Sequence, residues 1–401
     1  MIYLKLILRT TIVIFCTTLA VSIAQAQITN QEFSLASDNL TPADEETPDV
    51  YSELSPSCSS VSGGFLLGHT LNAGKSITLP STGPTSTTYV TDIKVVKKYG
   101  LVLGLQNNTL AYSEDAGCTY QEAFKIEPAP NNILKFSNLT NDDKFLIYTL
   151  NGNFIAQVNI SKSAGKVRFN AQSINFKNTI YGAGINIYDT RHLRIVGDNG
   201  FIYDSLNSGI SFKRKAATSL GNMYEASIDS QDINHIVSGT MEFGTSVTFD
   251  GGKTWSRSGG FPSKNMNAFN VKIAENSPSV IWTLALNMNE LDTNKMRAFY
   301  RSIDGGKTFK KEIEQEKIYG KGFTNGTPFL IAADNPHKIF FLIQEEWGSP
   351  AGTYLAQYQA NALESKSKTE FIPGRFIYSL GHHLSKPQLL HLGFYRVVHT
   401  P

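Results

Sequence analysis

Six side chains have the chemical types needed to act on a sugar or to bind one. They belong to three polar loops that contain acidic residues, the last of which also contains a tryptophan. Paired carboxylates can hydrolyse a glycosidic bond as acid and base, or as acid and nucleophile, and an aromatic ring can stack on a sugar. Solvated loop charge is the simpler interpretation, because most surface Glu and Asp are only hydrated. The ligand-binding candidates are Glu242, Glu290, Asp292, Glu345, Glu346 and Trp347, of which Glu242, Glu290 and Glu345 are the catalytic candidates if the chain is an enzyme.

A repeated eight-residue motif predicts the elements that position these loops. Two copies are nearly identical, TFDGGKTW at 248–255 and SIDGGKTF at 302–309. A third copy at 113–120 keeps the key residue types, and a fourth at 205–212 keeps them with Asn for Asp and Ser for Thr. The motif indicates a hairpin with a tight turn that needs positive φ. The carboxylate is expected to cap amides of its own loop, and the aromatic residue to pack inward.

This motif resembles the Asp box, or BNR repeat, whose pattern is Ser-x-Asp-x-Gly-x-Thr-Trp. The resemblance implies outer hairpins of β-propeller blades, as in sialidases, xyloglucanases, sortilin-type receptors and photosystem assembly factors. It also implies a structural role for the motif, away from the active or binding face. The residues concerned are Ser113, Asp115, Gly117, Thr119, Thr248, Asp250, Gly252, Thr254, Trp255, Ser302, Asp304, Gly306, Thr308 and Phe309.

The spacing of the copies predicts the number of blades. Ser205 and Thr248 are 43 residues apart, whereas Ser113 and Ser205 are 92 apart, which leaves room for one more blade between them. Segments 228–237, 273–282 and 331–340 each have the pattern strand, polar turn, strand, as expected of two inner strands of a blade. Weaker copies of the outer hairpin lie near Thr70, Ser163 and Gly352.

The two ends of the chain are expected to share one blade. Segments 376–380 and 389–398 have inner-strand character, and 64–79 has an outer hairpin, so joining them closes the ring and leaves no open sheet edge. We therefore predict an all-β fold, a seven-bladed β-propeller of four-stranded blades closed by a composite blade, with six blades as the alternative. The composite blade would abut the blade that contains Cys118, which makes a Cys58–Cys118 disulfide a candidate.

The first residues predict export. Lys5 and Arg9 precede a short apolar run and the small-x-small sequence at 24–26, a pattern typical of a cleavable signal peptide. The run is shorter than the roughly 20 residues that a membrane-spanning helix needs. We expect a signal peptide over 1–26 with cleavage after Ala26, a flexible acidic lead-in over 27–57, and a single propeller over 58–401. The mature protein would then be periplasmic or extracellular, without a membrane span.

Several other chemistries lack support in the sequence. The formal net charge of +2 gives no electrostatic case for nucleic-acid binding. The loosely spaced His382, His383 and His391 favour a structural role over a metal site. No nucleophile elbow, phosphate-binding glycine loop or Cys-x-x-Cys occurs, so we expect neither a cofactor nor a metal. The adjacent pair Tyr224-Glu225 is weak support for a catalytic nucleophile.

The leading functional hypothesis is a monomeric, non-catalytic propeller that binds a protein or glycan partner. The alternative is a glycoside hydrolase of the sialidase-like superfamily. Sialidases of this fold use an arginine triad and a Phe/Tyr-Arg-Ile-Pro motif, and this sequence shows neither. In a blade, the loops between the second and third strands lie on the face opposite the Asp boxes, where propeller ligands usually bind. The three acidic loops are expected to meet on that face.

Overall fold

The structure, a computed structural model, describes most of the chain from residue 55 to residue 396. The described residues are 55–82, 87–127, 133–140, 143–215, 220–293, 295–314, 324, 326–343, 352–362, 368–373, 376–382, 386 and 388–396. The expected signal peptide and nearly all of the acidic lead-in lie outside them, as do Glu345, Glu346, Trp347 and His383.

Three of the sheets are antiparallel and contain four strands each. Their strands follow one another in sequence order, so each strand pairs with the next strand along the chain. These sheets consist of β6 (Leu134–Phe136), β7 (Lys144–Thr149), β8 (Ile155–Ser163) and β9 (Lys166–Ser173); β10 (Gly182–Ile185), β11 (Leu193–Val196), β12 (Ile202–Ser205) and β13 (Lys213–Lys215); and β22 (Phe329–Ala332), β23 (Asn335–Ile343), β24 (Gly352–Gln359) and β25 (Lys368–Pro373).

Two larger sheets contain the other strands. The eight-stranded sheet joins two runs of four sequential strands, β14 (Met223–Ile228), β15 (Ile236–Thr240), β16 (Phe243–Thr248), β17 (Ser256–Arg257), and β18 (Met266–Ala274), β19 (Ser277–Asn287), β20 (Arg297–Ser302), β21 (Lys310–Glu314). The seven-stranded sheet contains β1 (Leu67–Thr70), β2 (Thr88–Val96), β3 (Leu101–Gln106), β4 (Thr109–Ser113), β5 (Gln121–Lys125), β26 (Phe376–His382) and β27 (Leu390–Arg396).

Helical structure is limited to two short 3-10 helices in the described ranges. They are η1 (Lys97–Tyr99), which follows β2, and η2 (Asp198–Gly200), which follows β11. Across the described parts of the chain, no helix has the length and hydrophobicity needed to cross a membrane.

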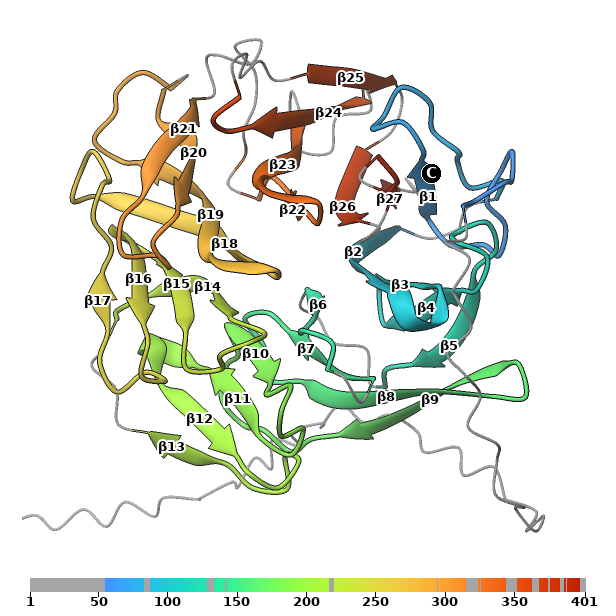
Figure 1. Ribbon diagram of the computed structural model, residues 1–401, viewed down its shortest axis with the longest axis horizontal. Coiled ribbons are helices and arrows are strands. Elements are labelled where there is room, and N and C mark those ends of the chain that lie inside the picture. Colours follow the sequence, from blue (N-terminus) through green and yellow to red (C-terminus); the bar gives the residue numbers. More distant parts are fainter. Residues whose placement is uncertain are drawn as a thin grey trace, which may run out of the picture.

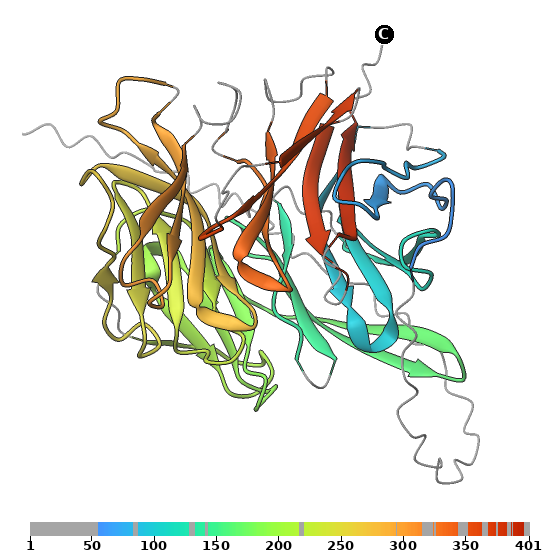
Figure 2. The ribbon, with the colours of Figure 1, turned by 45° about the horizontal axis from the view of Figure 1, so that its top comes forward.

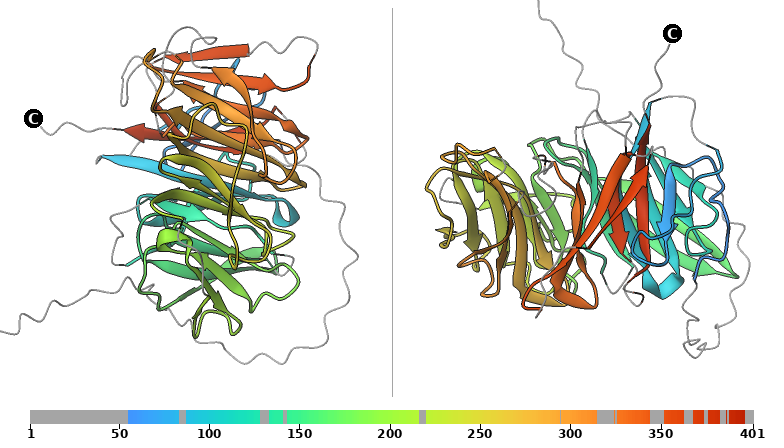
Figure 3. Two further views of the ribbon diagram at one scale, coloured as in Figure 1. Left: turned by 90° about the vertical axis from the view of Figure 1, so that its left-hand side faces the viewer. Right: turned by 90° about the horizontal axis from the view of Figure 1, so that it is seen from above.

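The sheets are arranged radially around a common centre. Figure 1 shows β2, β6, β14, β18, β22 and β26 nearest to this centre. The strands run between the two faces of a thick disc, as Figures 2 and 3 show. β27 brings the ends of the chain together, because it pairs antiparallel with both β26 and β1 and touches β2. A bridge between His69 and Thr78 continues this sheet beyond β1.

The hydrophobic core lies between neighbouring sheets. β3 is buried over its whole length, and Leu103 on this strand packs in one cluster with Phe145 of β7 and Val158 of β8. The outermost strands are more exposed, as in β9. β3 has a nearly continuous apolar sequence because neighbouring parts of the fold cover both of its faces.

Polar side chains on the innermost strands join adjacent sheets. Asp92 Oδ2 on β2 accepts a hydrogen bond of 2.9 Å from the backbone N–H of Phe136 on β6. The Asn138 side chain donates to the carbonyl of Ile185 at the end of β10 and accepts from its N–H. These polar groups are satisfied by backbone partners and are structural. Similar side-chain to backbone contacts link other innermost segments, some of them within one sheet: Ser227 with Ile273, Asn270 with Thr327, and Ser379 with Val90.

Cys58 and Cys118 form a disulfide that fastens the N-terminal segment to the hairpin after β4. Backbone contacts continue this attachment, because Ser62 N–H donates to the Cys118 carbonyl and Tyr120 N–H donates to the Ser62 carbonyl. The segment before β1 is therefore held both covalently and by backbone hydrogen bonds.

Candidate functional site

The repeated hairpins share one hydrogen-bond pattern. The Thr248 hydroxyl donates to Asp250 Oδ1 at 2.8 Å and accepts from Gly252 N–H at 2.9 Å. Asp250 also accepts from the N–H and the hydroxyl of Thr254, at 2.9 and 2.7 Å. The two contacts of the first hydroxyl recur in the hairpins at 302–308, 113–119, 205–211 and 70–76. We call the face of the disc with these hairpins the box face.

The acidic loops lie between the second and third strands of their runs. Glu242 is between β15 and β16, and Glu290 and Asp292 are between β19 and β20. Residues 345–347 fall in the equivalent connection between β23 and β24, outside the described residues. Because successive strands alternate in direction, these connections lie on the face opposite the box face, which we call the loop face.

Each described acidic side chain on the loop face has a local partner or is exposed. Glu290 Oε1 accepts a hydrogen bond of 3.1 Å from Asp292 N–H, and Asp292 is 3.3 Å from the Lys295 ammonium. The Glu242 side chain is exposed, and its N–H donates to Asn267 Oδ1 at 2.9 Å. The Glu290 and Asp292 carboxylates are thus held by contacts within their own loop, and no described contact pairs either of them with Glu242.

The segment before β18 connects the two described loops. Met266 N–H donates to the Glu242 carbonyl at 3.1 Å, and Met288 N–H donates to the Asn265 carbonyl at 3.0 Å. The β15–β16 and β19–β20 loops therefore form one continuous area of the loop face.

A cavity of about 280 Å³ lies among the innermost strands. Its lining includes residues of β2, β6, β10, β14 and β18. Asp92, Lys135, Glu225 and Lys272 bring four charged groups to it from four different strands. We call this space the central cavity.

Lys135 and Glu225 form a partly buried ion pair in the central cavity. Lys135 Nζ is 3.7 Å from Glu225 Oε1. Glu225 is only 8% exposed, and its Oε2 atom has no hydrogen-bond partner. Burial lowers the pKa of Lys135, but the charges of Glu225 and Asp92 outweigh burial and raise that pKa above its ordinary value. Lys135 is therefore a firmly charged group.

Lys272 has a different environment. Its ammonium lies 5.5 Å from the ring centroid of Phe329, a favourable cation–π contact. Burial, together with the charge of Lys135, lowers the pKa of Lys272, although the charges of Asp92 and Glu225 oppose the shift. Two lysines of one cavity thus have pKa values that are shifted in opposite directions.

A second cavity of about 280 Å³ adjoins the first, because both are lined by Ile93, Lys94 and Glu275. Asn276 and Ala333 also line it. They belong to turns between first and second strands, β18–β19 and β22–β23, which lie on the box face. The second cavity therefore extends from the central cavity toward the box face, whereas the sequence predicted a binding site on the loop face.

Lys135 and Lys272 were not among the site residues predicted from the sequence. Lys135 stands between two apolar residues of β6, and Lys272 between two apolar residues of β18. A charged residue within an otherwise apolar first strand of a blade is the signal that could have identified both. Glu225 entered only as part of the Tyr224-Glu225 pair, which gave no indication of its lysine partner.

Two of the three histidines named above, His382 and His391, are among the described residues, and each lies in a strand of the C-terminal region. His382 Nδ1 accepts a hydrogen bond of 3.0 Å from Ala333 N–H, and His391 is fully buried in β27. Among the residues that the structure describes, no group of three or more His, Cys, Asp and Glu could hold a metal ion.

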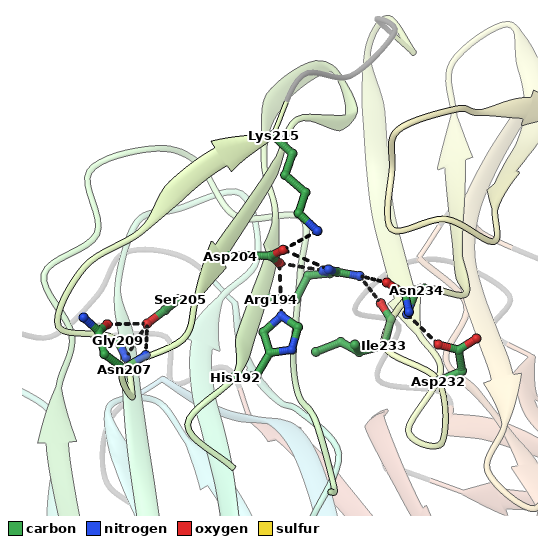
Figure 4. A network of polar contacts seen from close by, with 10 residues as sticks. All are labelled: His192, Arg194, Asp204, Ser205, Asn207, Gly209, Lys215, Asp232, Ile233 and Asn234. Atoms are coloured by element: carbon green, nitrogen blue, oxygen red, sulfur yellow. Dashed lines mark hydrogen bonds and ion pairs between the residues drawn. The ribbon is translucent and has the colours of Figure 1, made fainter. Parts of the chain in front are cut away.

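A buried ionic network joins the β10–β13 sheet to its neighbour (Figure 4). Arg194 is 1% exposed and donates to both carboxylate oxygens of Asp204, at 2.7 and 2.9 Å. It also donates to the Ile233 carbonyl at 2.6 Å, in the β14–β15 turn. Burial raises the pKa of Asp204, but the neighbouring His192, Arg194 and Lys215 side chains outweigh burial and hold that pKa well below its ordinary value. The network is structural.

Comparison with solved structures defines the class of protein as a β-propeller. YCF48 from Cyanidioschyzon merolae aligns with a TM-score of 0.51 and 13% identity, over 77% of this chain and 96% of that chain. A streptogramin B lyase aligns with a TM-score of 0.52 and 12% identity, over 84% and 100% of the two chains. At these identities the likeness shows the fold alone.

One curated protein is similar in sequence. It is the dispase autolysis-inducing protein of Streptomyces mobaraensis, which is 26% identical over 355 residues, covering 85% of this chain and 90% of the relative. No family model matches the chain.

Proposed function

We propose that this chain is an exported seven-bladed β-propeller of the Asp-box type that binds another protein and performs no chemistry itself. The observation that carries the proposal is an exposed apolar loop tip on the loop face. The export signal at 1–26 and the hairpin motifs support the location and the repeat type.

The strand pairing supports seven blades. Six runs of four sequential strands begin at β2, β6, β10, β14, β18 and β22. The seventh blade would combine β26 and β27 with β1 and the segment at Thr78, which is joined to β1 by a single bridge, since these pair in that order. This composite blade would close the ring.

The β19–β20 loop presents two apolar side chains to solvent. Leu291 is 95% exposed and Met288 is 48% exposed, and Glu290 and Asp292 flank Leu291 in sequence. A large aliphatic side chain left in water at a loop tip can insert into a partner's apolar pocket, which would remove it from water. The flanking carboxylates favour a pocket with a basic rim. Aliphatic anchors favour a protein over a glycan, whose usual stacking partner is an aromatic ring.

The relative also supports a protein partner. Its name describes the induction of autolysis in dispase, which is an effect on another protein. Dispase is therefore the first partner to test, and the loop face is the surface on which we place it.

The test measures binding of the mature protein to dispase by biolayer interferometry, together with the rate at which intact dispase disappears on a gel. Leu291→Asp is expected to weaken both effects at least tenfold, because it removes the anchor and adds charge. Ile303→Asp is the matched control, since Ile303 is 63% exposed in a box hairpin on the other face. Equal binding by wild type and Leu291→Asp would overturn the assignment of the loop.

The non-catalytic part of the proposal has its own test. Reporter sugars should not be hydrolysed by the mature protein, and a glycan array should show no turnover. Hydrolysis that disappears in Glu242→Gln or Glu290→Gln would instead support the glycoside hydrolase alternative.

A further inference from the structure

The charged groups of the central cavity are not all used to hold the fold together. Both carboxylate oxygens of Asp92 already have hydrogen-bond partners, because Oδ1 accepts from Ile93 N–H and Oδ2 accepts from Phe136 N–H. Ser227 is likewise occupied by Ile273 N–H. Glu225 differs, since its Oε2 atom is buried and has no hydrogen-bond partner. A buried carboxylate oxygen without a donor is costly unless a ligand supplies one.

Lys272 supplies the complementary group. Among the described residues, its ammonium has a contact with the Phe329 ring but no ion pair within 4.0 Å. Lys135 is less available to bind an anionic group of a ligand than Lys272 is, because Lys135 already pairs with Glu225. The lining thus includes a carboxylate with one unpartnered oxygen, that of Glu225, and a cation without an ion pair among the described residues, Lys272.

The charge balance of the lining selects the class of ligand. Three lysines and three acidic residues line the cavity, so it has no net formal charge. A ligand with a net charge would leave a buried charge uncompensated, which is unfavourable. A neutral ligand with separate positive and negative ends would satisfy both free groups. A volume of about 280 Å³ limits it to a small molecule.

We propose that the central cavity binds a free neutral α-amino acid, with its ammonium donating to the Glu225 carboxylate and its carboxylate accepting from Lys272 Nζ. Lys135 positions Glu225 by pairing with Oε1. This site is separate from the apolar loop tip, so either proposal can fail without the other.

The experiment uses isothermal titration calorimetry on the mature protein with glycine, L-alanine, L-leucine and L-glutamine. At least one of them is expected to bind at millimolar concentration or better. N-acetyl-L-alanine lacks the ammonium and L-alaninamide lacks the carboxylate, so each should bind roughly tenfold or more weakly than L-alanine. Failure of all four amino acids to bind would overturn the proposal.

Two variants test which residue binds the ammonium of the ligand and which binds its carboxylate. Lys272→Met should abolish the preference for L-alanine over L-alaninamide, whereas Glu225→Gln should abolish the preference for L-alanine over N-acetyl-L-alanine. Glu275→Gln is the matched control, because Glu275 lines the same cavity but is exposed, and it should change affinity less than twofold. Unchanged preferences in Lys272→Met would overturn the assignment even if Glu225→Gln failed to fold.

Discussion

At the scale of single residues, the box carboxylates act as hydrogen-bond acceptors for their own loops. Their charge is not essential for this role, because Asn207 occupies the same position and its Oδ1 accepts from Ser211 N–H at 3.0 Å. Asn72 makes the equivalent contact with Ser76 N–H at 2.8 Å. The chain therefore contains natural versions of the Asp→Asn substitution.

Asp250→Asn is expected to change the free energy of unfolding little at neutral pH, whereas Asp250→Ala should lower it by about 1–2 kcal/mol, since it removes the acceptor altogether. Chemical denaturation of both variants measures the difference. Equal destabilisation by the two substitutions would show that charge, and not acceptor geometry, is what the hairpin needs.

The same residue gives a pH prediction. Burial raises the pKa of Asp250, but hydrogen bonds from Thr254 and Thr248 outweigh burial and lower it from 3.8 to about 2. A lowered native pKa stabilises the fold above the ordinary pKa, and this stabilisation is lost as pH falls from about 4 to about 2. Asp250→Asn should therefore flatten the acid limb of stability against pH, which denaturation at several pH values tests.

Arg194 provides a second prediction at the residue scale. Arg194→Met should lower the free energy of unfolding by about 3 kcal/mol, because it leaves the buried Asp204 without its bidentate partner. Arg191→Met is the control, since Arg191 is 72% exposed in its pair with Asp189 and such surface pairs contribute about 0–1 kcal/mol. A cost below about 1 kcal/mol for Arg194→Met would mean that Lys215 alone compensates Asp204.

At the scale of elements, the box hairpin requires two consecutive residues with positive φ. Gly251 and Gly252 have φ of 70° and 83°, and Gly305 and Gly306 have 75° and 92°. The second glycine also lacks space for a side chain, because a Cβ on Gly252 would lie 2.2 Å from Ile202 Cγ1. The hairpin is thus constrained both by its own turn and by the strand packed against it.

A comparison of Gly252→Ala with Gly221→Ala separates the cost of a positive φ from the cost of the clash with Ile202. Gly221 also has a positive φ of 73°, but nothing lies within 4 Å of its Cβ position. Gly221→Ala should cost about 1 kcal/mol from backbone strain alone. Gly252→Ala should cost about 1–3 kcal/mol more because of the clash, as thermal or denaturant unfolding would show. Equal costs would mean that Ile202 moves away freely.

The strands were well predicted from local patterns because hairpin turns and alternating apolar segments are local signals. The segment 273–282 was expected to be strand, turn, strand, and β18 ends at Ala274 while β19 begins at Ser277. The weak copy near Ser163 is likewise a hairpin, between β8 and β9. Contacts between sheets, such as Asp92 with Phe136, depend on residues far apart in sequence and were not predictable in this way.

At the scale of the whole molecule, the N-terminal segment is fastened by a disulfide that closes a stretch of 60 residues. Replacing both Cys58 and Cys118 by Ala should lower the free energy of unfolding by about 4 kcal/mol, chiefly because the unfolded chain gains freedom. Denaturant unfolding of wild type with and without reductant, and of the double variant, measures this. Reductant should not change the free energy of unfolding of the double variant. If it did, the effect of reductant on the wild type could not be assigned to this disulfide.

The sequence by itself determined the repeat, its hairpins and the radial arrangement of sheets, because each of these follows from turn chemistry and spacing within about fifty residues. It also indicated that the two chain ends come together. Only the tertiary structure brought Asp92, Lys135, Glu225 and Lys272 into one cavity, since they stand on four strands separated by long stretches of chain. Which of these charged groups come into contact depends on which strands lie side by side at the centre. No single segment of the sequence specifies that arrangement, because it results from the packing of all the sheets.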